Sequence, residues 1–255
     1  QFDVVLRAQD DDGVATTVPL SVTVTNPGPA LGVTQGPSAL DEGTRGVWTA
    51  SAVDALGDPV ELSWDFGDGA PPQIGTDLLS VEHAFSDEGS FVVLVSALDA
   101  FGGSASLSLP VVVANVAPIA GSPPFASTGE GTPADAQLDA LDPGDDTLEW
   151  VALTLPGGAS LSPAGDFAWT PDFAAAEAGA ASFDVLVRDG DGGSDRLIWT
   201  ASVAFLDADA DGLPDTWEAQ HGLDPTVDDS AEDPDADGLS NADEWRDDTD
   251  PSQSD

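Results

Sequence analysis

Two copies of one acidic pattern fill residues 207–255, beginning at Asp207 and Asp233, an offset of 26 residues. Each copy has oxygen-bearing side chains at positions 1, 3, 5 and 9, glycine at position 6 and glutamate at position 12. This spacing is typical of a calcium-binding loop, because alternate side chains point inward and the glycine permits a sharp turn. The predicted ligands are Asp207, Asp209, Asp211, Leu213, Asp215 and Glu218 in the first copy, and Asp233, Asp235, Asp237, Leu239, Asn241 and Glu244 in the second.

Ca²⁺ is the predicted ion because every predicted ligand atom is an oxygen. Leu213 and Leu239 are expected to offer backbone carbonyls. Glu218 and Glu244 are expected to close each site with both carboxylate oxygens. No Cys or His joins the pattern, which argues against zinc and copper. The opposing interpretation is a solvated acidic tail. Two matches in one register favour calcium, since a bound cation makes so many adjacent carboxylates favourable.

With these motifs, residues 207–255 resemble the thrombospondin type 3 repeats of bacterial secreted proteins, with a loop similar to that of an EF-hand. The segment departs from a full EF-hand before the first loop, where residues 197–206 have the pattern of a strand and the incoming helix is missing. Short exiting helices are predicted near residues 215–220 and 241–246.

Ahead of this module, three apolar stretches recur, starting at Phe2, Phe91 and Phe183, at offsets of 89 and 92 residues. A period of this size, made of short alternating strands, predicts immunoglobulin-like sandwiches. The predicted fold class is therefore all-β: tandem immunoglobulin-like β-sandwiches followed by a small calcium-binding loop module with short helices. The expected divisions fall at residues 1–25, 26–115, 116–206 and 207–255.

Residues 1–25 are expected to be only the C-terminal hairpin of an incomplete sandwich, with Val4, Leu6 and Ala8 facing inward. A lone hairpin is marginally stable in water, so upstream residues or another chain would have to complete it. Because Gln1 begins in mid-strand, we expect the chain to be a fragment or a processed product of a longer protein. Self-assembly by strand complementation through residues 1–25 is the sharper hypothesis, and an arbitrary boundary is the simpler one.

Two sandwiches carry family motifs. The run Trp-Asp-Phe-Gly-Asp-Gly at residues 64–69, with His-Ala-Phe at 83–85, resembles the PKD domain family. That resemblance implies a β-sandwich without catalysis, commonly a spacer in secreted proteins. The run Gly-Asp-Phe-Ala-Trp-Thr-Pro at residues 165–171 resembles the cadherin-like, immunoglobulin-like domains of bacterial surface proteins.

The cadherin-like resemblance implies further calcium sites at domain junctions, built from a glutamate near a domain start and aspartates in nearby loops. The matching residues are Glu42, Asp54 and Asp99 in one sandwich, and Glu130, Asp142 and Asp191 in the other. Aspartates in glycine-rich turns are also ordinary turn residues, and this interpretation is favoured.

The composition excludes several classes of function. With 48 acidic residues against five basic ones, general affinity for nucleic acids or for anionic membrane surfaces is excluded. No apolar run reaches the roughly 18 residues of a membrane-spanning helix, so no membrane insertion is expected. His83 is predicted to be a structural hydrogen-bonding residue and His221 to lie at a helix C-terminus. No catalytic or organic-cofactor site is therefore predicted.

The sequence favours a non-enzymatic, extracellular, calcium-binding structural or adhesive protein: a bacterial stalk, adhesin or surface-fibre subunit rigidified by Ca²⁺. Modules of this type fill at about 10⁻⁴–10⁻³ M Ca²⁺, a concentration found outside cells. Two alternatives stay open. One is an accessory spacer or polysaccharide-binding region of a secreted hydrolase, although the tryptophans in apolar runs favour core packing over sugar binding. The other is a calcium-regulated protein-binding module.

Overall fold

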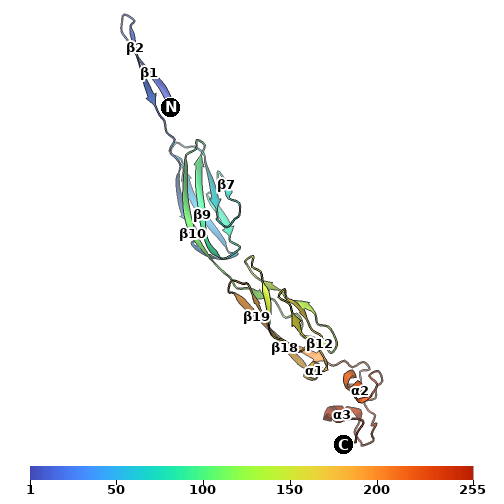
Figure 1. Ribbon diagram of the computed structural model, residues 1–255. Helices are drawn as coiled ribbons and strands as arrows, with labels where there is room; N and C mark the ends of the chain where they lie inside the picture. The colour runs from blue at the N-terminus through green and yellow to red at the C-terminus, as the bar shows by residue number, and fades with distance from the viewer. Residues whose placement is uncertain (255) are drawn as a thin grey trace. The chain divides into compact units, whose positions relative to one another are not determined.

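A computed structural model describes residues 1–254 and shows an all-β chain with three short helices in that range (Figure 1). The predicted fold class is confirmed. The chain divides into two compact units, Gln1–Asn115 and Val116 onward. Each unit holds one β-sandwich with its own buried core. No helix within residues 1–254 is both long enough and apolar enough to cross a membrane.

The first unit begins with an isolated hairpin of β1 (Phe2–Gln9) and β2 (Ala15–Val22). Among the described strands, these two pair only with each other. No layer of this chain covers the expected inward face: Leu6 is 67% exposed, and every residue of both strands is exposed. A two-stranded ribbon has no second layer to cover either face, so alternation along the strand produces no buried side.

The sandwich of the first unit consists of a five-stranded sheet and a three-stranded sheet. In sheet order the strands are β4 (Ala39–Asp41), β10 (Ser104–Ala114), β9 (Gly89–Asp99), β6 (Val60–Asp65) and β7 (Gln73–Gly75), then β3 (Ala30–Gln35), β5 (Arg45–Val53) and β8 (Ser80–Ala84). Along β9, Val93 and Val95 are buried while Val92 and Leu94 are exposed, as expected for a strand with one face on the core.

After Trp64 the chain makes a capped loop that contacts a structural histidine. Asp65 Oδ1 accepts a hydrogen bond from Gly67 N at 3.0 Å. His83 stacks on Phe66 with ring centroids 3.9 Å apart, and its Nε2 lies 2.6 Å from Asp68 Oδ2. His83 therefore holds the turn against β8, which agrees with the structural role expected for it.

The sandwich of the second unit has three sheets and a short helix, α1 (Phe173–Glu177). In sheet order the strands are β12 (Ser127–Gly129), β19 (Ser194–Ala204), β18 (Ala180–Arg188) and β15 (Glu149–Thr154), then β13 (Ala136–Gln137), β17 (Asp166–Ala168) and β16 (Ser160–Leu161), then β11 (Ile119–Ala120) and β14 (Ala140–Leu141).

Tryptophans fill both cores, as the sequence predicts. Phe183 and Trp199 stack with centroids 4.5 Å apart in the second sandwich. The buried tryptophans of the two sandwiches are Trp48, Trp64, Trp150, Trp169 and Trp199. Because these rings lie inside the cores, they offer no surface for stacking on a sugar.

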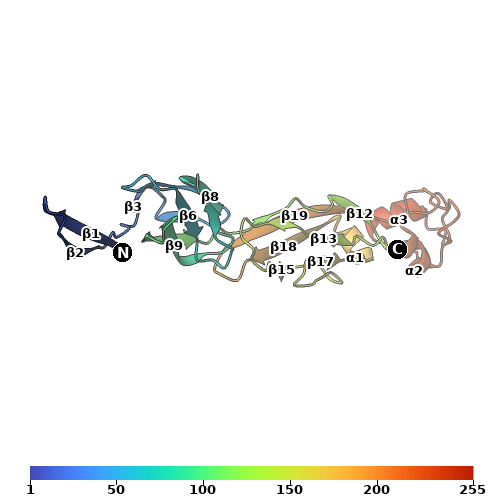
Figure 2. The ribbon, with the colours of Figure 1, turned by 90° about the horizontal axis from the view of Figure 1, so that it is seen from above.

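The second unit ends with two helices, α2 (Asp215–His221) and α3 (Asn241–Asp247), which agree with the short helices predicted from the sequence (Figures 1 and 2). The ring of Trp245 in α3 lies 5.5 Å from that of Trp217 in α2 and 5.6 Å from that of Phe205. Phe173 of α1 also contacts Trp245, with centroids 6.4 Å apart. The two helices thus pack on each other and on the end of the sandwich where β19 ends.

Candidate metal sites

The first acidic loop, residues 207–218, is organised by its own carboxylates. Asp207 Oδ2 accepts a hydrogen bond from Gly212 N at 3.2 Å. Asp209 Oδ1 accepts one from Asp211 N at 3.2 Å, and Asp211 Oδ1 accepts one from Leu213 N at 2.8 Å. These bonds bend the chain so that carboxylate oxygens of all three aspartates come within 4.8 Å of one another.

The second loop, residues 233–244, has the same geometry. Asp233 Oδ2 accepts from Gly238 N at 3.0 Å, Asp235 Oδ1 from Asp237 N at 3.1 Å, and Asp237 Oδ1 from Leu239 N at 2.9 Å. Every bond repeats one of the first loop at the offset of 26 residues, so the repeat in the sequence is also a repeat in structure.

The backbone is left-handed at two positions of each loop. Gly212 and Gly238 have φ angles of 95° and 107°, which glycine adopts readily. Ala210 and Ala236 have φ angles of 63° and 62°, where a side chain costs roughly 1 kcal/mol or more. Both alanines sit at position 4, and the loop accepts this strain in order to turn the flanking aspartates toward one centre.

Glu218, at position 12 of the first loop, is the most informative residue of the site. It is 0% exposed, and neither carboxylate oxygen has a hydrogen-bond partner. One of its oxygens lies within 4.8 Å of oxygens of Asp211 and Asp229. Burial, followed by the charges of Asp211, Asp209 and Asp229, raises the pKa of Glu218 to about 7. A buried carboxylate without donors is costly, and a bound cation removes that cost.

The second loop repeats the burial of its glutamate, since Glu244 is also 0% exposed. Burial also raises the pKa of Asp209 and of Asp235, the aspartates at position 3, and neighbouring aspartates add to the shift. The carboxyl groups of Asp209, Glu218 and Asp235 thus resist ionisation unless a positive charge is supplied. The donor set is entirely oxygen, which fits calcium.

The two position-9 residues differ. Asp215 Oδ1 accepts a hydrogen bond from Ala208 N at 2.7 Å. In the second loop the counterpart of Ala208 is Pro234, which has no N–H to donate to the position-9 side chain. Asn241 instead donates from Nδ2 to Asp229 O at 2.8 Å and to Asp229 Oδ1 at 3.3 Å. Its Oδ1 is buried without a hydrogen-bond partner and is thus available as a ligand.

Asp229 was not among the predicted ligands, and the structure brings it to the first site. It lies in the segment between the loops, is 8% exposed, and has a carboxylate oxygen close to those of Asp211 and Glu218. The sequence held a signal for it: the offset of 26 residues from Asp229 falls on another aspartate, Asp255. Asp255 lies outside the described residues.

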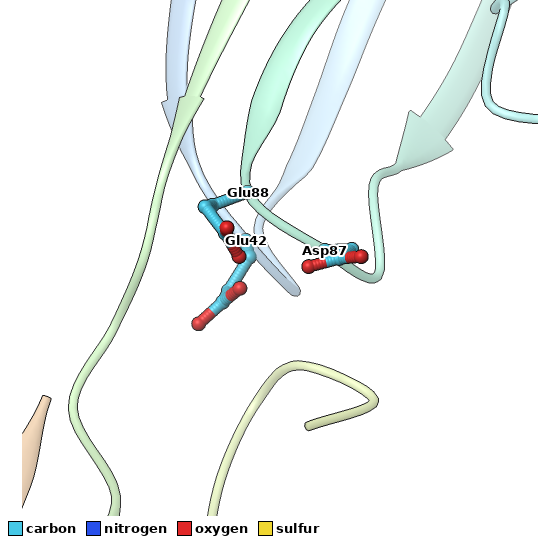
Figure 3. Close-up of side chains that lie close together, drawn as sticks. All are labelled: Glu42, Asp87 and Glu88. Carbon is cyan, nitrogen blue, oxygen red and sulfur yellow. The ribbon is translucent and has the colours of Figure 1, made fainter. Parts of the chain in front are cut away.

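Among the further candidates in the first sandwich, Glu42 and Asp99 lie at opposite ends. Glu42 lies beside Asp87 and Glu88 (Figure 3). Glu42 N donates a hydrogen bond to Ala114 O, at the end of the sheet where β9 begins. Asp99 is the last residue of β9 and lies at the other end. Because β9 has 11 residues, its ends lie about 33 Å apart. Asp54 Oδ1 accepts from Leu56 N at 2.7 Å, as an ordinary turn residue does.

In the second sandwich Glu130 lies apart from Asp191, whereas Asp142 and Asp191 each have a carboxylate oxygen within 4.8 Å of one of Asp146. Glu130 N bonds Ala204 O at the end of β19, whereas Asp191 precedes the start of β19. Asp142 Oδ1 accepts a hydrogen bond from Gly144 N at 2.9 Å, again as a turn residue. The Glu130 carboxylate instead accepts hydrogen bonds from Thr216 Oγ1 at 2.5 Å and Leu206 N at 3.4 Å. Glu130 therefore joins the sandwich to the first acidic loop.

Two family models match parts of the chain. The model described as "PKD domain" matches residues 30–113, and the model described as "Bacterial Ig domain" matches residues 115–203. The resemblance of the first sandwich to PKD domains is thus confirmed, and the second sandwich is similar to bacterial immunoglobulin-like domains. Such domains are typically non-catalytic and typical of extracellular proteins. The comparison with curated proteins gave no match.

Solved structures show weak likenesses. The PKD domain of an M14-like peptidase from Thermoplasmatales archaeon SCGC AB-540-F20 is 25% identical over 35% of this chain and 98% of that chain, with a TM-score of 0.30. The protocadherin GammaB4 extracellular domain is 18% identical over 80% of this chain, with a TM-score of 0.32, and this chain covers only 38% of it. The insect immune protein hemolin is 13% identical over 79% of this chain and 55% of that chain, with a TM-score of 0.40.

Proposed function

We propose that this chain is a non-enzymatic, calcium-binding structural or adhesive segment of an extracellular protein, and that residues 207–255 form a double calcium module similar to thrombospondin type 3 repeats. The observation that carries the proposal is Glu218, whose carboxylate is 0% exposed, has no hydrogen-bond partner and lies beside two further carboxylates. Only a cation satisfies all of these oxygens at once.

Calcium binding has a mechanical consequence in this arrangement. Glu218 adjoins Trp217, and Glu244 adjoins Trp245, so each predicted position-12 ligand is next to a ring of the aromatic cluster. Fixing both glutamates on an ion also fixes α2 and α3, and with them the contact of Trp245 with Phe205 of the sandwich. Calcium therefore stiffens the junction between sandwich and module, which suits a stalk or an adhesive segment.

The extracellular setting is supported by two arguments. PKD and bacterial immunoglobulin-like domains are typical of extracellular proteins. Weak calcium modules load at about 10⁻⁴–10⁻³ M, which only extracellular calcium supplies. The alternative of an accessory spacer in a secreted hydrolase shares both features, and binding of the chain to insoluble polysaccharide would favour it.

The direct test is a calcium titration of the chelated full chain, followed by tryptophan fluorescence and by melting temperature. Because Trp217 and Trp245 adjoin the sites, we expect a saturable fluorescence change together with a rise in stability. That rise should amount to about 2.7 kcal/mol for each occupied site at a hundredfold excess over its Kd. Glu218→Gln should weaken the response, whereas Glu232→Gln, an exposed control nearby, should leave it unchanged. An identical protein in chelator and in millimolar calcium would overturn the proposal.

A second role, self-assembly by strand complementation through residues 1–25, is favoured by the complete exposure of β1 and β2. Such a ribbon gains a second layer or a further strand when a neighbour supplies one. Val4 faces Leu20 in the hairpin register, and both are exposed. Sedimentation of the full chain should show a concentration-dependent larger species, which Val4→Lys with Leu20→Lys abolishes. A monomer at all concentrations, with or without calcium, contradicts this role.

A further inference from the structure

We propose that Asp229 is an additional ligand of the first calcium site and that its hydrogen bonds with Asn241 couple this site to the second, so that the two ions bind cooperatively. The inference rests on the proposed calcium function and adds a ligand and a regulation to it. The assignment joins two observations: a buried carboxylate between the loops, and an amide that reaches from the second loop to that carboxylate.

Asp229 has the position and the burial of a ligand. Its carboxylate is within 4.8 Å of those of Asp211 and Glu218, although the three residues come from position 5, position 12 and the segment after α2. Three mostly buried carboxylates in such a space repel one another strongly, because little water is present to screen them. The unpartnered oxygens of Glu218 point to a cation at their centre.

Asn241 reaches both sites through the two ends of one amide. Its Nδ2 donates to the backbone oxygen and to Oδ1 of Asp229. Its Oδ1, at position 9 of the second loop, is buried and has no hydrogen-bond partner. Because the amide is planar and rigid, the position of Asp229 sets the direction in which Oδ1 of Asn241 points. A ligand of the first ion thereby orients a ligand of the second.

A backbone connection runs beside this amide. Asp211 Oδ2 accepts a hydrogen bond from Ser230 N at 3.1 Å. Ser230 O in turn accepts one from Ala242 N at 2.9 Å, and Asn241 N donates to Glu232 O at 2.8 Å. The segment after Asp229 is thus tied to a ligand of the first loop and to the first turn of α3.

The arrangement of Asp229 and Asn241 is expected to differ between the empty and the occupied first site. Without an ion in the first site, repulsion pushes Asp229 away from Asp211 and Glu218 and disturbs its bonds to Asn241. With an ion present, Asp229 is drawn inward and Asn241 is set for the second site. Coupling of this kind is reciprocal, so the second ion must strengthen binding of the first by the same factor.

The test is a calorimetric titration of the chelated full chain with CaCl₂, read together with tryptophan fluorescence. We expect two ions per chain and a Hill coefficient above 1. In Glu244→Gln, which disables the second site, the first site should bind at least about fivefold more weakly than in the parent chain. In Glu218→Gln, the second site should weaken by the same factor. Two ions binding independently, each unaffected by loss of the other site, would overturn the coupling and leave the calcium function intact.

Asn241→Asp separates coupling from ligation. Aspartate keeps an oxygen at position 9, as Asp215 does in the first loop, but it cannot donate to Asp229. We expect both sites to remain and the Hill coefficient to fall to about 1. If Asn241 serves only as a ligand, cooperativity should persist in Asn241→Asp and the added charge should tighten the second site. That result would contradict coupling through the Asn241–Asp229 hydrogen bond.

Asp229→Asn tests the added ligand, with Asp228→Asn as its matched control. Asp228 is the exposed neighbour, so its substitution removes the same charge but leaves the group of Asp211, Glu218 and Asp229 complete. We expect Asp229→Asn to weaken the first site roughly tenfold and Asp228→Asn to change it less than twofold. Equal effects of the two substitutions would show that Asp229 acts only through long-range charge. Failure of the parent chain to bind calcium at all would sink the proposed function itself, which is a separate outcome.

Discussion

Thr216 Oγ1 donates a 2.5 Å hydrogen bond to Glu130 Oε1, which joins helix α2 of the proposed calcium module to the end of the second sandwich. The second Glu130 oxygen accepts from Leu206 N, at the point where the chain leaves the sandwich. Since Thr216 lies between Asp215 and Glu218, this bond connects the first loop directly to Glu130. The junction is therefore a small polar contact beside an aromatic one.

Thr216→Val should loosen this junction. The change keeps the shape of the side chain but leaves Glu130 Oε1 buried without its donor, which costs about 1–3 kcal/mol. We expect a lower free energy of unfolding in calcium and faster hydrogen exchange in α2. Thr226→Val is the control, because Thr226 bonds only Asp224 in an exposed turn. Equal losses in the two variants would show that the Glu130 contact contributes nothing special.

Trp245→Ala should uncouple the module from the sandwich while leaving the loops intact. The ring contacts Trp217, Phe205 and Phe173, so its removal takes away most of the aromatic contact. Chemical denaturation should show a loss of about 2–4 kcal/mol. Calcium should still bind to both loops in calorimetry. A variant as stable as the parent chain would mean that the aromatic cluster does not hold the module.

Glu218 predicts a pH dependence of the calcium-free chain. Its pKa is raised from the ordinary 4.5 to about 7, so the folded chain holds a proton that the unfolded chain releases. This contribution to stability is complete below pH 4.5 and is lost as the pH rises through 7. In chelator, the melting temperature should therefore fall between pH 5 and pH 8 by more in the parent chain than in Glu218→Gln. In saturating calcium the difference should disappear, and a parent chain that gains stability over this range contradicts the assignment.

Gly212→Ala should damage the first loop through its backbone. Gly212 has φ of 95° and open space around the position of a Cβ, so the cost is conformational strain and not a clash. We expect a loss of roughly 1–2 kcal/mol and weaker calcium binding at the first site. Gly157→Ala is the control, because that glycine has open space and an ordinary φ. Binding as tight as in the parent chain would show that the turn tolerates alanine here, as it does at Ala210.

The repeat of 26 residues predicted the loops well because their geometry is local. Each of the bonds that bends the first loop, such as Asp211 N to Asp209 Oδ1, spans five residues or fewer. Such contacts depend only on the order of residue types, so the pattern predicts them directly. The two exiting helices and the tryptophan cores follow from local periodicity in the same way.

The junction candidates show where local patterns stop being informative. Glu42 and Asp99 each matched a motif, yet β9 places them at opposite ends of one sandwich. The same is true of Glu130 and Asp191 in the second sandwich. A sequence motif identifies a candidate residue, but it does not show at which end of the sandwich that residue lies. That information comes from the pairing of the sheets.

The sequence by itself determined the all-β class, the two sandwich cores and ten side-chain and two backbone ligand candidates, because alternation, turn residues and loop spacing act over a few residues. Only the tertiary structure decided that Asp229 joins Asp211 and Glu218, that Asn241 reaches across to Asp229, and that Glu130 meets Thr216. Each of these contacts joins residues that are 11 or more apart along the chain. Their proximity depends on how the elements pack, and packing is decided by the whole set of buried side chains and not by any single motif.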